Sequence, residues 1–541
     1  MLLLSLRAFA QEQISLDKVN YIAISPEAAA LHDAINYPLD GNKGVPDISI
    51  PLYTIKYGKI SIPITLRYTT SAAKIDKSTA PNAGFGWVLD VGGCINRVIR
   101  GKPDESAQWY QADYSTFFNQ LRANDDQYTI SGIYDWCNTI NNYDSEKDEF
   151  VMITPKGRSS FYLSGSEGEY DGYFSPSVNW KIDATCRYSA PGGIQMFTGI
   201  DILDGEGTKY RFGSGSGNTT PTSSDASFIE YCSYDILGNG MTYSTGWQLR
   251  EVEDDAGNKV KFTYTRSGNY TYSSCQDQWY KVTDCPSVLW SEDAEASQSY
   301  LNNYFPTGEN TESPYSLTTF RHVQPYTISW PQGSVKVEVS NSTRLISSIQ
   351  ICDRNGVQIR KISFLTKANN IDNEKPLLSS VTVKDAGNTT QQVYYFEYNS
   401  VANGTIIAPS CDWWGYFNGT TISQNSYLPN RLITAQGYQF STTFSLGNGG
   451  DRSPNPNYIT HNILKSIKYP GGGSTEFIFE PNSYSKERGN TVPQGIGPGL
   501  RIKTIQYMDK NGEVLKKTRL HIYRWQHLYP SGFLLYHQFH I

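Results

Sequence analysis

The chain has 541 residues, of which 18% are charged, and its formal net charge at pH 7 is −6. Its length exceeds the roughly 250–300 residues at which a single core stops growing, so it predicts several domains or one large shell. The acidic balance argues against a nucleic-acid partner, which needs a basic face. We expect no transmembrane segment, because no apolar run reaches the roughly 18 residues of a spanning helix.

The first residues, MLLLSLRAFAQEQ, lead from a short apolar run to Ala8-Phe9-Ala10. A small-x-small triplet after an apolar stretch is typical of a signal-peptidase site. We therefore expect residues 1–10 to be a signal peptide, incomplete at its start, and the mature protein to begin at Gln11 and to be exported. A chance apolar start is the alternative.

Alternating apolar residues predict β-hairpins along most of the chain. Residues 48–68 are the clearest case, with a reversal at Gly58-Lys59. Pro51 and Pro63 cannot donate to a strand ladder, which indicates sheet edges or bulges. Many of the turns contain Asn-Gly or Asp-Gly, which tolerate the positive φ angles of two-residue turns. Further hairpins are expected at 148–164, 197–213, 247–265, 345–364, 377–398, 464–480 and 502–520.

The predicted fold class is all-β, an irregular series of antiparallel hairpins and meanders that form sandwich-like or shell-like sheets. The turn glycines keep no constant period, so a regular solenoid is not indicated. Segments rich in Asn, Ser and Tyr between the hairpins are typical of long surface loops. We expect an N-terminal β domain over residues 11–245 and a hairpin-rich region over residues 246–541.

The stretch NAGFGWVLDVGGCINRVIRG, residues 82–101, holds glycines on both sides of an apolar run. A dinucleotide fingerprint needs a third glycine that opens a helix, and Trp87-Val88-Leu89 stands in its place. The stretch instead predicts a strand, a turn or bulge at Gly92-Gly93, and a second strand. Gly84 and Gly86 would allow close backbone approach, and Trp87 would be the apolar anchor beneath them.

Five stretches together resemble the N-terminal region of large bacterial Rhs/YD-repeat proteins. They are GVPDISIPLYTIKYGKISIPITLRY, GFGWVLDVGGCINRVIRGKPDE, DWWGYFNG at 412–419, YPGGGSTEFIFEPNSY at 469–484 and GPGLRIKTI at 497–505. The resemblance implies an exported, β-rich bacterial protein whose downstream repeats coil into a hollow shell, often around a C-terminal toxin or effector. The family's Asp-Pro-x-Gly motif does not occur in the sequence. We therefore expect a chain truncated before the repeat array, or one part of a larger assembly.

No metalloprotease, hydrolase, phosphate-loop or complete EF-hand motif occurs, so no catalytic residue, metal ligand or cofactor is predicted. Four histidines near the C-terminus fit no common ligand spacing. Asp353-Arg354-Asn355-Gly356 and Asp509-Lys510-Asn511-Gly512 resemble calcium-loop starts, but each lacks the distal Glu. Asp254-Asp255 and Asp148-Glu149 are sequence-adjacent carboxylates, which on a strand point to opposite faces and are poor candidates for a glycosidase site.

The densest aromatic cluster, Trp413, Trp414, Tyr416 and Phe417, surrounds Gly415 and follows Asp412. It could stack on sugar rings, or it could plug the core, and the second is favoured because aromatic residues dominate core burial. Cys275 and Cys285 could close a short disulfide loop, or both could be unpaired thiols.

Three functions remain open at this stage. The first is a non-enzymatic exported scaffold, toxin-associated like the Rhs shell. The second is a stand-alone cell-surface module that binds carbohydrate or protein, and the third and weakest is a hydrolase. Because the strands of the last hairpin, at 502–507 and 513–523, would have an open edge, we expect either a separate or downstream YD-repeat chain as partner, or self-association.

Overall fold

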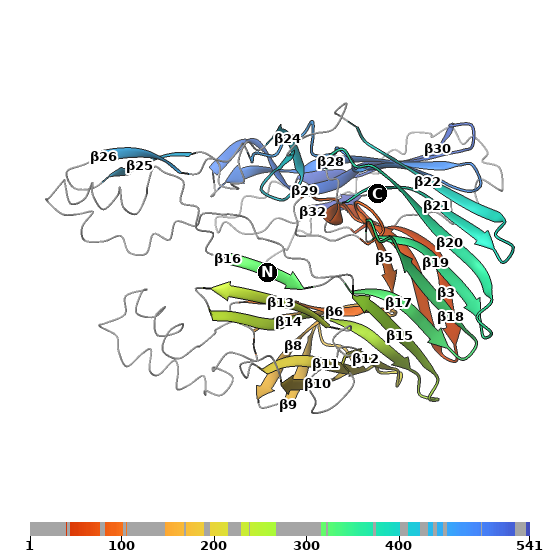
Figure 1. Ribbon diagram of the computed structural model, residues 1–541. Helices are drawn as coiled ribbons and strands as arrows, with labels where there is room; N and C mark the ends of the chain where they lie inside the picture. Colours follow the sequence, from red (N-terminus) through yellow and green to blue (C-terminus); the bar gives the residue numbers. More distant parts are fainter. Residues whose placement is uncertain are drawn as a thin grey trace, which may run out of the picture.

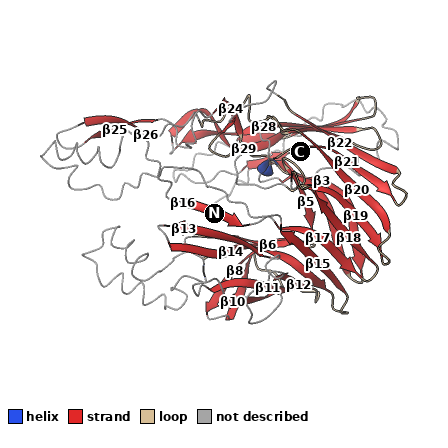
Figure 2. Cartoon of the chain, in the orientation of Figure 1, coloured by secondary structure: helices blue, strands red, loops and turns tan. Residues whose placement is uncertain are grey.

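The structure is a computed structural model of the chain. It describes residues 39–40, 44–75, 82–100, 104, 147–166, 169–188, 195–214, 229–236, 239–266, 315–320, 323–343, 345–371, 375–400, 409–421, 431–436, 441–446, 452–487, 490–524 and 537–540. Within these ranges the chain is built from antiparallel strands, and the only helical element is the 3-10 turn η1, Thr70–Ala72 (Figure 2). The all-β prediction is confirmed. No helix in the described ranges is long and apolar enough to cross a membrane.

A three-stranded sheet at the N-terminal side has the order β3-β4-β5. Its strands are β3 (Ile48–Tyr57), β4 (Ile60–Tyr68) and β5 (Trp87–Val91). The alternating apolar residues of β3 and β4 are buried, with Ile55, Ile62 and Ile64 fully enclosed. The hairpin expected over residues 48–68 is confirmed.

The two prolines of this hairpin occupy different positions. Pro51 lies on the edge strand β3, beside a bulge between Pro51 and Tyr53. Pro63 lies on the central strand β4, in a part of it that β5 does not reach, so it stands at a local edge. The partner β5 begins its pairing at Ile64, one residue further on, so the missing N–H of Pro63 costs no ladder bond on that side.

The glycine pair Gly92-Gly93 carries the chain from this sheet into another. On one side β5 pairs with β4, and on the other β6 (Cys94–Val98) pairs with β7 (Glu149–Thr154) and β14 (Asn239–Glu253). Gly92 and Gly93 have φ angles of 81° and 148°. A Cβ at Gly93 would lie 2.3 Å from the carbonyl oxygen of Ile153. The strand, turn and strand expected over residues 87–98 are confirmed, and the turn joins two sheets.

Eight strands form a circuit in which the hydrogen-bonded pairings return to their start. The order is β6-β7-β8-β9-β10-β11-β12-β14, and β14 pairs again with β6. Their bounds are β7 (Glu149–Thr154), β8 (Gly157–Ser166), β9 (Glu169–Ser175), β10 (Lys181–Tyr188), β11 (Gln195–Leu203), β12 (Lys209–Gly213) and β14 (Asn239–Glu253). Phe150, Phe161, Phe197 and Trp247 are fully buried, and the rings of the other three lie within 6.0 Å of Phe150. This aromatic cluster forms the centre of the circuit.

From β14 a large curved sheet extends through strands that are nearly all consecutive along the chain. Its order is β14-β15-β17-β18-β19-β20-β21-β22-β27-β28-β29-β30. The bounds are β15 (Lys259–Arg266), β17 (Val323–Trp330), β18 (Gly333–Val339), β19 (Ile346–Asp353), β20 (Gln358–Lys367), β21 (Leu377–Asp385), β22 (Thr390–Tyr398), β27 (Leu464–Lys468), β28 (Ser474–Glu487), β29 (Asn490–Met508) and β30 (Val514–Arg519).

The curved sheet wraps around the three-stranded sheet, which lies on its inner side (Figure 1). Residues of both sheets and of the circuit belong to one hydrophobic core, including Ile62, Ile351 and Ile502. Hydrogen bonds also tie the layers together: the Tyr68 hydroxyl accepts the N–H of Leu464 at 2.9 Å. The small sheet therefore packs against the inner face of the curved sheet and fills the space that this sheet encloses.

Other described strands form short pairs. β13 (Ile229–Ile236) joins β14 and β16 (Tyr315–Phe320). The remaining pairs are β1 (Leu39–Asp40) with β2 (Val45–Pro46), β23 (Pro409–Cys411) with β24 (Phe417–Thr421), β25 (Arg431–Gln436) with β26 (Ser441–Leu446), and β31 (His521–Arg524) with β32 (His537–His540). Strand β14 runs through the boundary expected between residues 245 and 246, so the division into two regions stays a proposal.

Candidate functional site

One turn geometry that starts at an aspartate recurs six times among the described residues, and it accounts for the turn signals at Asp204-Gly205, Asn355-Gly356 and Asn511-Gly512. Each turn starts at an aspartate whose N–H and C=O bond to the residues four and three positions further on. In the turn that starts at Asp353, Oδ1 accepts the N–H groups of Asn355 and Val357, each at 2.9 Å. The six aspartates are Asp204, Asp254, Asp353, Asp385, Asp412 and Asp509.

The residue at the fourth position of this turn needs a positive φ angle. Five of the six turns have glycine there, with φ between 79° and 92°, and the sixth has Asn388 at 61°. These are three-residue loops with one left-handed residue, and the prediction of two-residue turns at these sites was wrong. The physical reason is the aspartate side chain, which caps the N–H groups of the loop and makes the longer turn stable.

The turn that starts at Asp412 differs from the other five in what it carries. Its second and third positions are Trp413 and Trp414, whereas the corresponding residues elsewhere are polar or small. Trp413 is 50% exposed, and Tyr416 and Phe417 are buried. Trp414 is half-buried against the core. The four aromatic residues of the sequence prediction therefore divide into one outward and three inward side chains.

The environment of Asp412 combines burial with charge. Its Oδ1 accepts the N–H groups of Trp414 and Tyr416, at 2.9 Å and 3.0 Å. Its Oδ2 is buried and makes no hydrogen bond, whereas Oδ2 accepts a donor in each of the other five turns. Burial raises the pKa of Asp412, and the nearby Arg452 only partly opposes this effect.

Arg452 fixes the outer side of the same turn. Its Nη2 donates to the carbonyl oxygen of Asp412 at 2.9 Å, and its guanidinium lies 5.7 Å from the centre of the Trp413 ring. On the other side, the N–H of Ile75 donates to the carbonyl oxygen of Gly415 at 3.0 Å. The turn is therefore held between the residues that follow η1 and the segment around residue 452.

A group of buried polar side chains lies close to Phe417. Asn462 donates to Asn369 Oδ1 at 2.7 Å and to Asn370 Oδ1 at 2.9 Å. His461 Nε2 lies 3.0 Å from Asn370 Oδ1, and burial lowers the pKa of this imidazole. These contacts join two loops, and nothing in the sequence indicated them because the partners lie about 90 residues apart.

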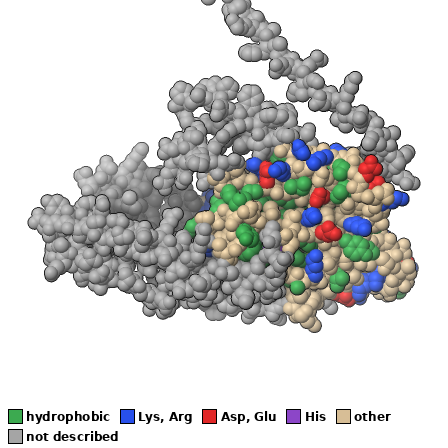
Figure 3. Space-filling view, turned by 90° about the horizontal axis from the view of Figure 1, so that it is seen from above, with side chains coloured by type: hydrophobic (Ala, Val, Ile, Leu, Met, Phe, Trp, Pro, Cys, Tyr) green, Lys and Arg blue, Asp and Glu red, His purple; other side chains and the backbone are tan. Residues whose placement is uncertain are grey.

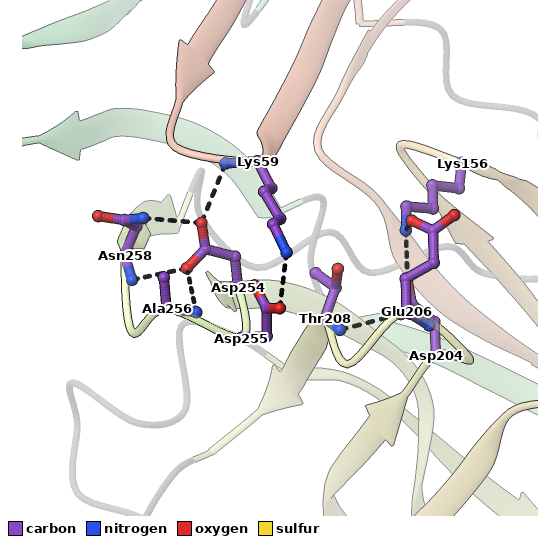
Figure 4. Close-up of polar contacts among 9 residues, drawn as sticks. All are labelled: Lys59, Lys156, Asp204, Glu206, Thr208, Asp254, Asp255, Ala256 and Asn258. Atoms are coloured by element: carbon purple, nitrogen blue, oxygen red, sulfur yellow. Dashed lines mark hydrogen bonds and ion pairs between the residues drawn. The ribbon is translucent and has the colours of Figure 1, made fainter.

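A second polar cluster gathers four hairpin tips at one place (Figure 4). Asp254 Oδ2 accepts the backbone N–H of Lys59 at 3.0 Å, and Lys59 Nζ bonds Asp255 at 2.6 Å. Nearby, Lys156 Nζ contacts both Asp204, at 2.6 Å, and Glu206, at 2.5 Å.

Like Asp204, Asp254 accepts four hydrogen bonds within this cluster. It accepts four N–H groups: the Asn258 side chain and the backbones of Lys59, Asn258 and Ala256. Led by the bond from the Asn258 side chain, these donors lower its pKa to about 2. The cluster ties β3-β4 to β14-β15. No group of three or more metal-ligating side chains occurs among the described residues.

In the other sequence-adjacent pair, Asp148-Glu149, the aspartate forms a buried ion pair. The Asp148 and Arg97 side chains are fully buried and form an ion pair, with Nε to Oδ2 at 2.8 Å. Asp148 also accepts the backbone N–H groups of Arg100 and Asp104. Burial raises the pKa of Asp148, and Arg97 opposes it. The Asp148 carboxylate is therefore engaged in hydrogen bonds within the protein.

The remaining predicted residues are placed as follows. Gly84, Gly86 and Gly415 have positive φ angles of 129°, 79° and 92°. Trp87 is fully buried and donates from Nε1 to the Tyr398 hydroxyl at 2.9 Å. Cys275 and Cys285 lie outside the described residues, so their disulfide stays a prediction.

No protein-family model matches the chain, and no curated protein matches it. Among solved structures, it is similar to a chain of the crystal structure of TcdB2-TccC3-Cdc42, at 10% identity over 91% of this chain and 20% of that chain, with a TM-score of 0.34. It is also similar to the N-terminal domain of the effector protein SpvB from Salmonella typhimurium strain LT2, at 11% identity over 66% of this chain and 95% of that domain, with a TM-score of 0.27. Of the two, the chain spans nearly all of the SpvB domain but only about a fifth of the first chain.

Proposed function

We propose that this chain is a non-enzymatic scaffold, an exported wall segment of a larger toxin-associated assembly of the Rhs/YD-repeat type. The observation that carries the proposal is the continuous antiparallel sheet that curves around the small sheet (Figure 1). A sheet of consecutive strands can be lengthened at its end without a change in its core, as a wall requires. Its surface, viewed from above, mixes both charge signs with hydrophobic side chains over the described part (Figure 3).

The carboxylates that could have suggested a hydrolase support the scaffold instead. Asp254 and Asp148 each accept several N–H groups of the protein. A carboxylate committed to such bonds is poorly placed to act as a general acid or nucleophile. We therefore assign no reaction to these pairs.

Purification of the tagged protein from its native host, followed by electron cryomicroscopy, tests the proposal. The expected result is a hollow particle whose wall contains the curved sheet. A particle no larger than this one chain would contradict it. Mass spectrometry of the same sample is expected to show a mature N-terminus at Gln11, and an intact Met1 in cytosolic protein would remove the export part.

One observation favours the second candidate, a carbohydrate-binding module. Trp413 is not needed to form its turn, since five turns of the same geometry have no aromatic residue at that position. A half-exposed indole beside a guanidinium is a suitable stacking surface for a sugar ring.

A glycan array tests this candidate with the full chain and two variants. Trp413→Ala is expected to abolish binding, and Arg354→Ala, at the matching position of the Asp353 turn, is expected to leave it unchanged. Absence of any bound glycan on the wild-type protein, or equal binding by both variants, would exclude a role for Trp413.

A further inference from the structure

Among the described strands, β30 is the outermost strand of the curved sheet and is paired along one edge only. Residues 514–519 pair with 504–508 of β29, and no other described strand pairs with them. The outward N–H and C=O groups of such a strand can form a new ladder with an extended segment. The six residues of β30 are enough for a strand of ordinary length.

The open edge carries a concentrated positive charge. Lys516, Lys517 and Arg519 are three of its six residues, and the strand contains no acidic residue. None of the three forms an ion pair with the residues that the structure describes, whereas Arg501 and Lys503 on the adjacent β29 both pair with Glu480. Lys517 and Arg519 are exposed and, two positions apart, lie on the same face.

This charge decides between the possible occupants of the edge. If β30 paired with β30 of a second copy, cations would oppose cations, and like charges directly opposite each other destabilise a strand pair. The self-association expected from the sequence is therefore disfavoured at this edge. A segment with acidic residues at alternate positions would place opposite charges beside Lys517 and Arg519.

We propose that the open edge of β30 binds an extended acidic segment of another polypeptide as an additional antiparallel strand. Backbone hydrogen bonds hold the segment, and Lys517 and Arg519 select its acidic side chains. The proposal stands on strand pairing and charge alone, so its failure would leave the scaffold function untouched.

Fluorescence anisotropy with the full chain and three labelled peptides tests the selection. The peptides have eight residues, with Glu, Gln or Lys alternating with Thr and Val. The Glu peptide is expected to bind at least about tenfold more tightly than the Gln peptide, the order of two favourable cross-strand charge pairs. The Lys peptide is expected not to bind.

Charge-reversal variants separate strand pairing from general electrostatic attraction. Lys517→Glu with Arg519→Glu is expected to reverse the preference from the Glu to the Lys peptide. The matched control is Lys465→Glu with Lys468→Glu on β27, a strand paired on both sides, and it is expected to change nothing. Equal effects of the two double variants would overturn the proposal.

Hydrogen exchange provides the second readout. The N–H groups of β30 that do not bond β29 are expected to become protected when the Glu peptide binds, because a new ladder satisfies them. Peptide binding without that protection would overturn strand addition. No binding of any peptide would also overturn it, and would mean that the basic residues only keep the edge from pairing.

Discussion

Glycines with positive φ angles serve two different regions of this molecule, the corner at residues 84–93 and the hairpin tips. At the tips, a Cβ on Gly257, Gly356 or Gly512 would meet nothing within 4 Å. At the corner, a Cβ on Gly86 or Gly93 would lie within 2.4 Å of another atom. The comparison shows that these three tips need only a backbone conformation, whereas the corner also needs the space.

The largest expected effect is at Gly93. In Gly93→Ala the new Cβ would meet the Ile153 carbonyl oxygen at 2.3 Å, and a backbone atom between two paired strands cannot move aside. Strain and overpacking together should lower the free energy of unfolding by about 4 kcal/mol. Denaturant unfolding measures it, with Gly356→Ala as the control. Equal losses in both variants would show that space is unimportant at the corner.

Gly86→Ala should have the next largest effect. Its Cβ would lie 2.4 Å from the Tyr68 ring, a side chain that can yield a little. Displacing that ring weakens the bond between the Tyr68 hydroxyl and the N–H of Leu464. We expect a loss of about 3 kcal/mol, from overpacking and the weakened buried bond. An unchanged melting temperature would contradict this account of the corner.

Asp254→Asn tests the tips by their side-chain caps. The amide of asparagine would turn a donor toward the N–H of Lys59 or the side chain of Asn258, both of which are donors themselves. The control is Asp353→Asn, in a turn of the same geometry whose aspartate bonds no residue of another sheet. The melting temperature is expected to fall more in Asp254→Asn.

The melting temperatures of the same two variants should also depend differently on pH. Because the pKa of Asp254 is lowered from 3.8 to about 2, its stabilisation is present above pH of about 4 and is lost as the pH falls toward 2. Wild type and Asp353→Asn should lose melting temperature over that range more steeply than Asp254→Asn. Parallel curves would show that the pKa of Asp254 is the same in the folded and the unfolded protein.

The smallest effect is expected for Gly356→Asn. In the sixth turn Asn388 already holds the equivalent position at a φ angle of 61°. Asparagine should therefore cost about 0.5 kcal/mol, and alanine about 1 kcal/mol, because asparagine tolerates the left-handed region better. Thermal unfolding of both variants checks the order, and a greater loss with asparagine would contradict it.

Local patterns in the sequence predicted those features that depend on residues close together in the chain, namely strands and turns. Alternation found β3 and β4, and the glycine pair at 92–93 marked the corner. The pairing of Cys94 with Gln248, and hence the circuit, could not be predicted, because it depends on residues about 150 positions apart. The cap at Asp412 could have been found from the recurring Asp-x-x-Gly spacing. Its contact with Arg452, 40 residues away, carries no local signal.

The enclosure of the small sheet sets the order in which the protein can fold. Strands β3–β5 are synthesised before their covering strands, and the bond from Leu464 to Tyr68 spans 396 residues. Such distant contacts make folding slow, since long loops must close before packing rewards them. Until then, the apolar residues of β4 remain uncovered and able to aggregate. A cell that makes this protein must therefore keep its first strands apart from other chains until the last strands arrive.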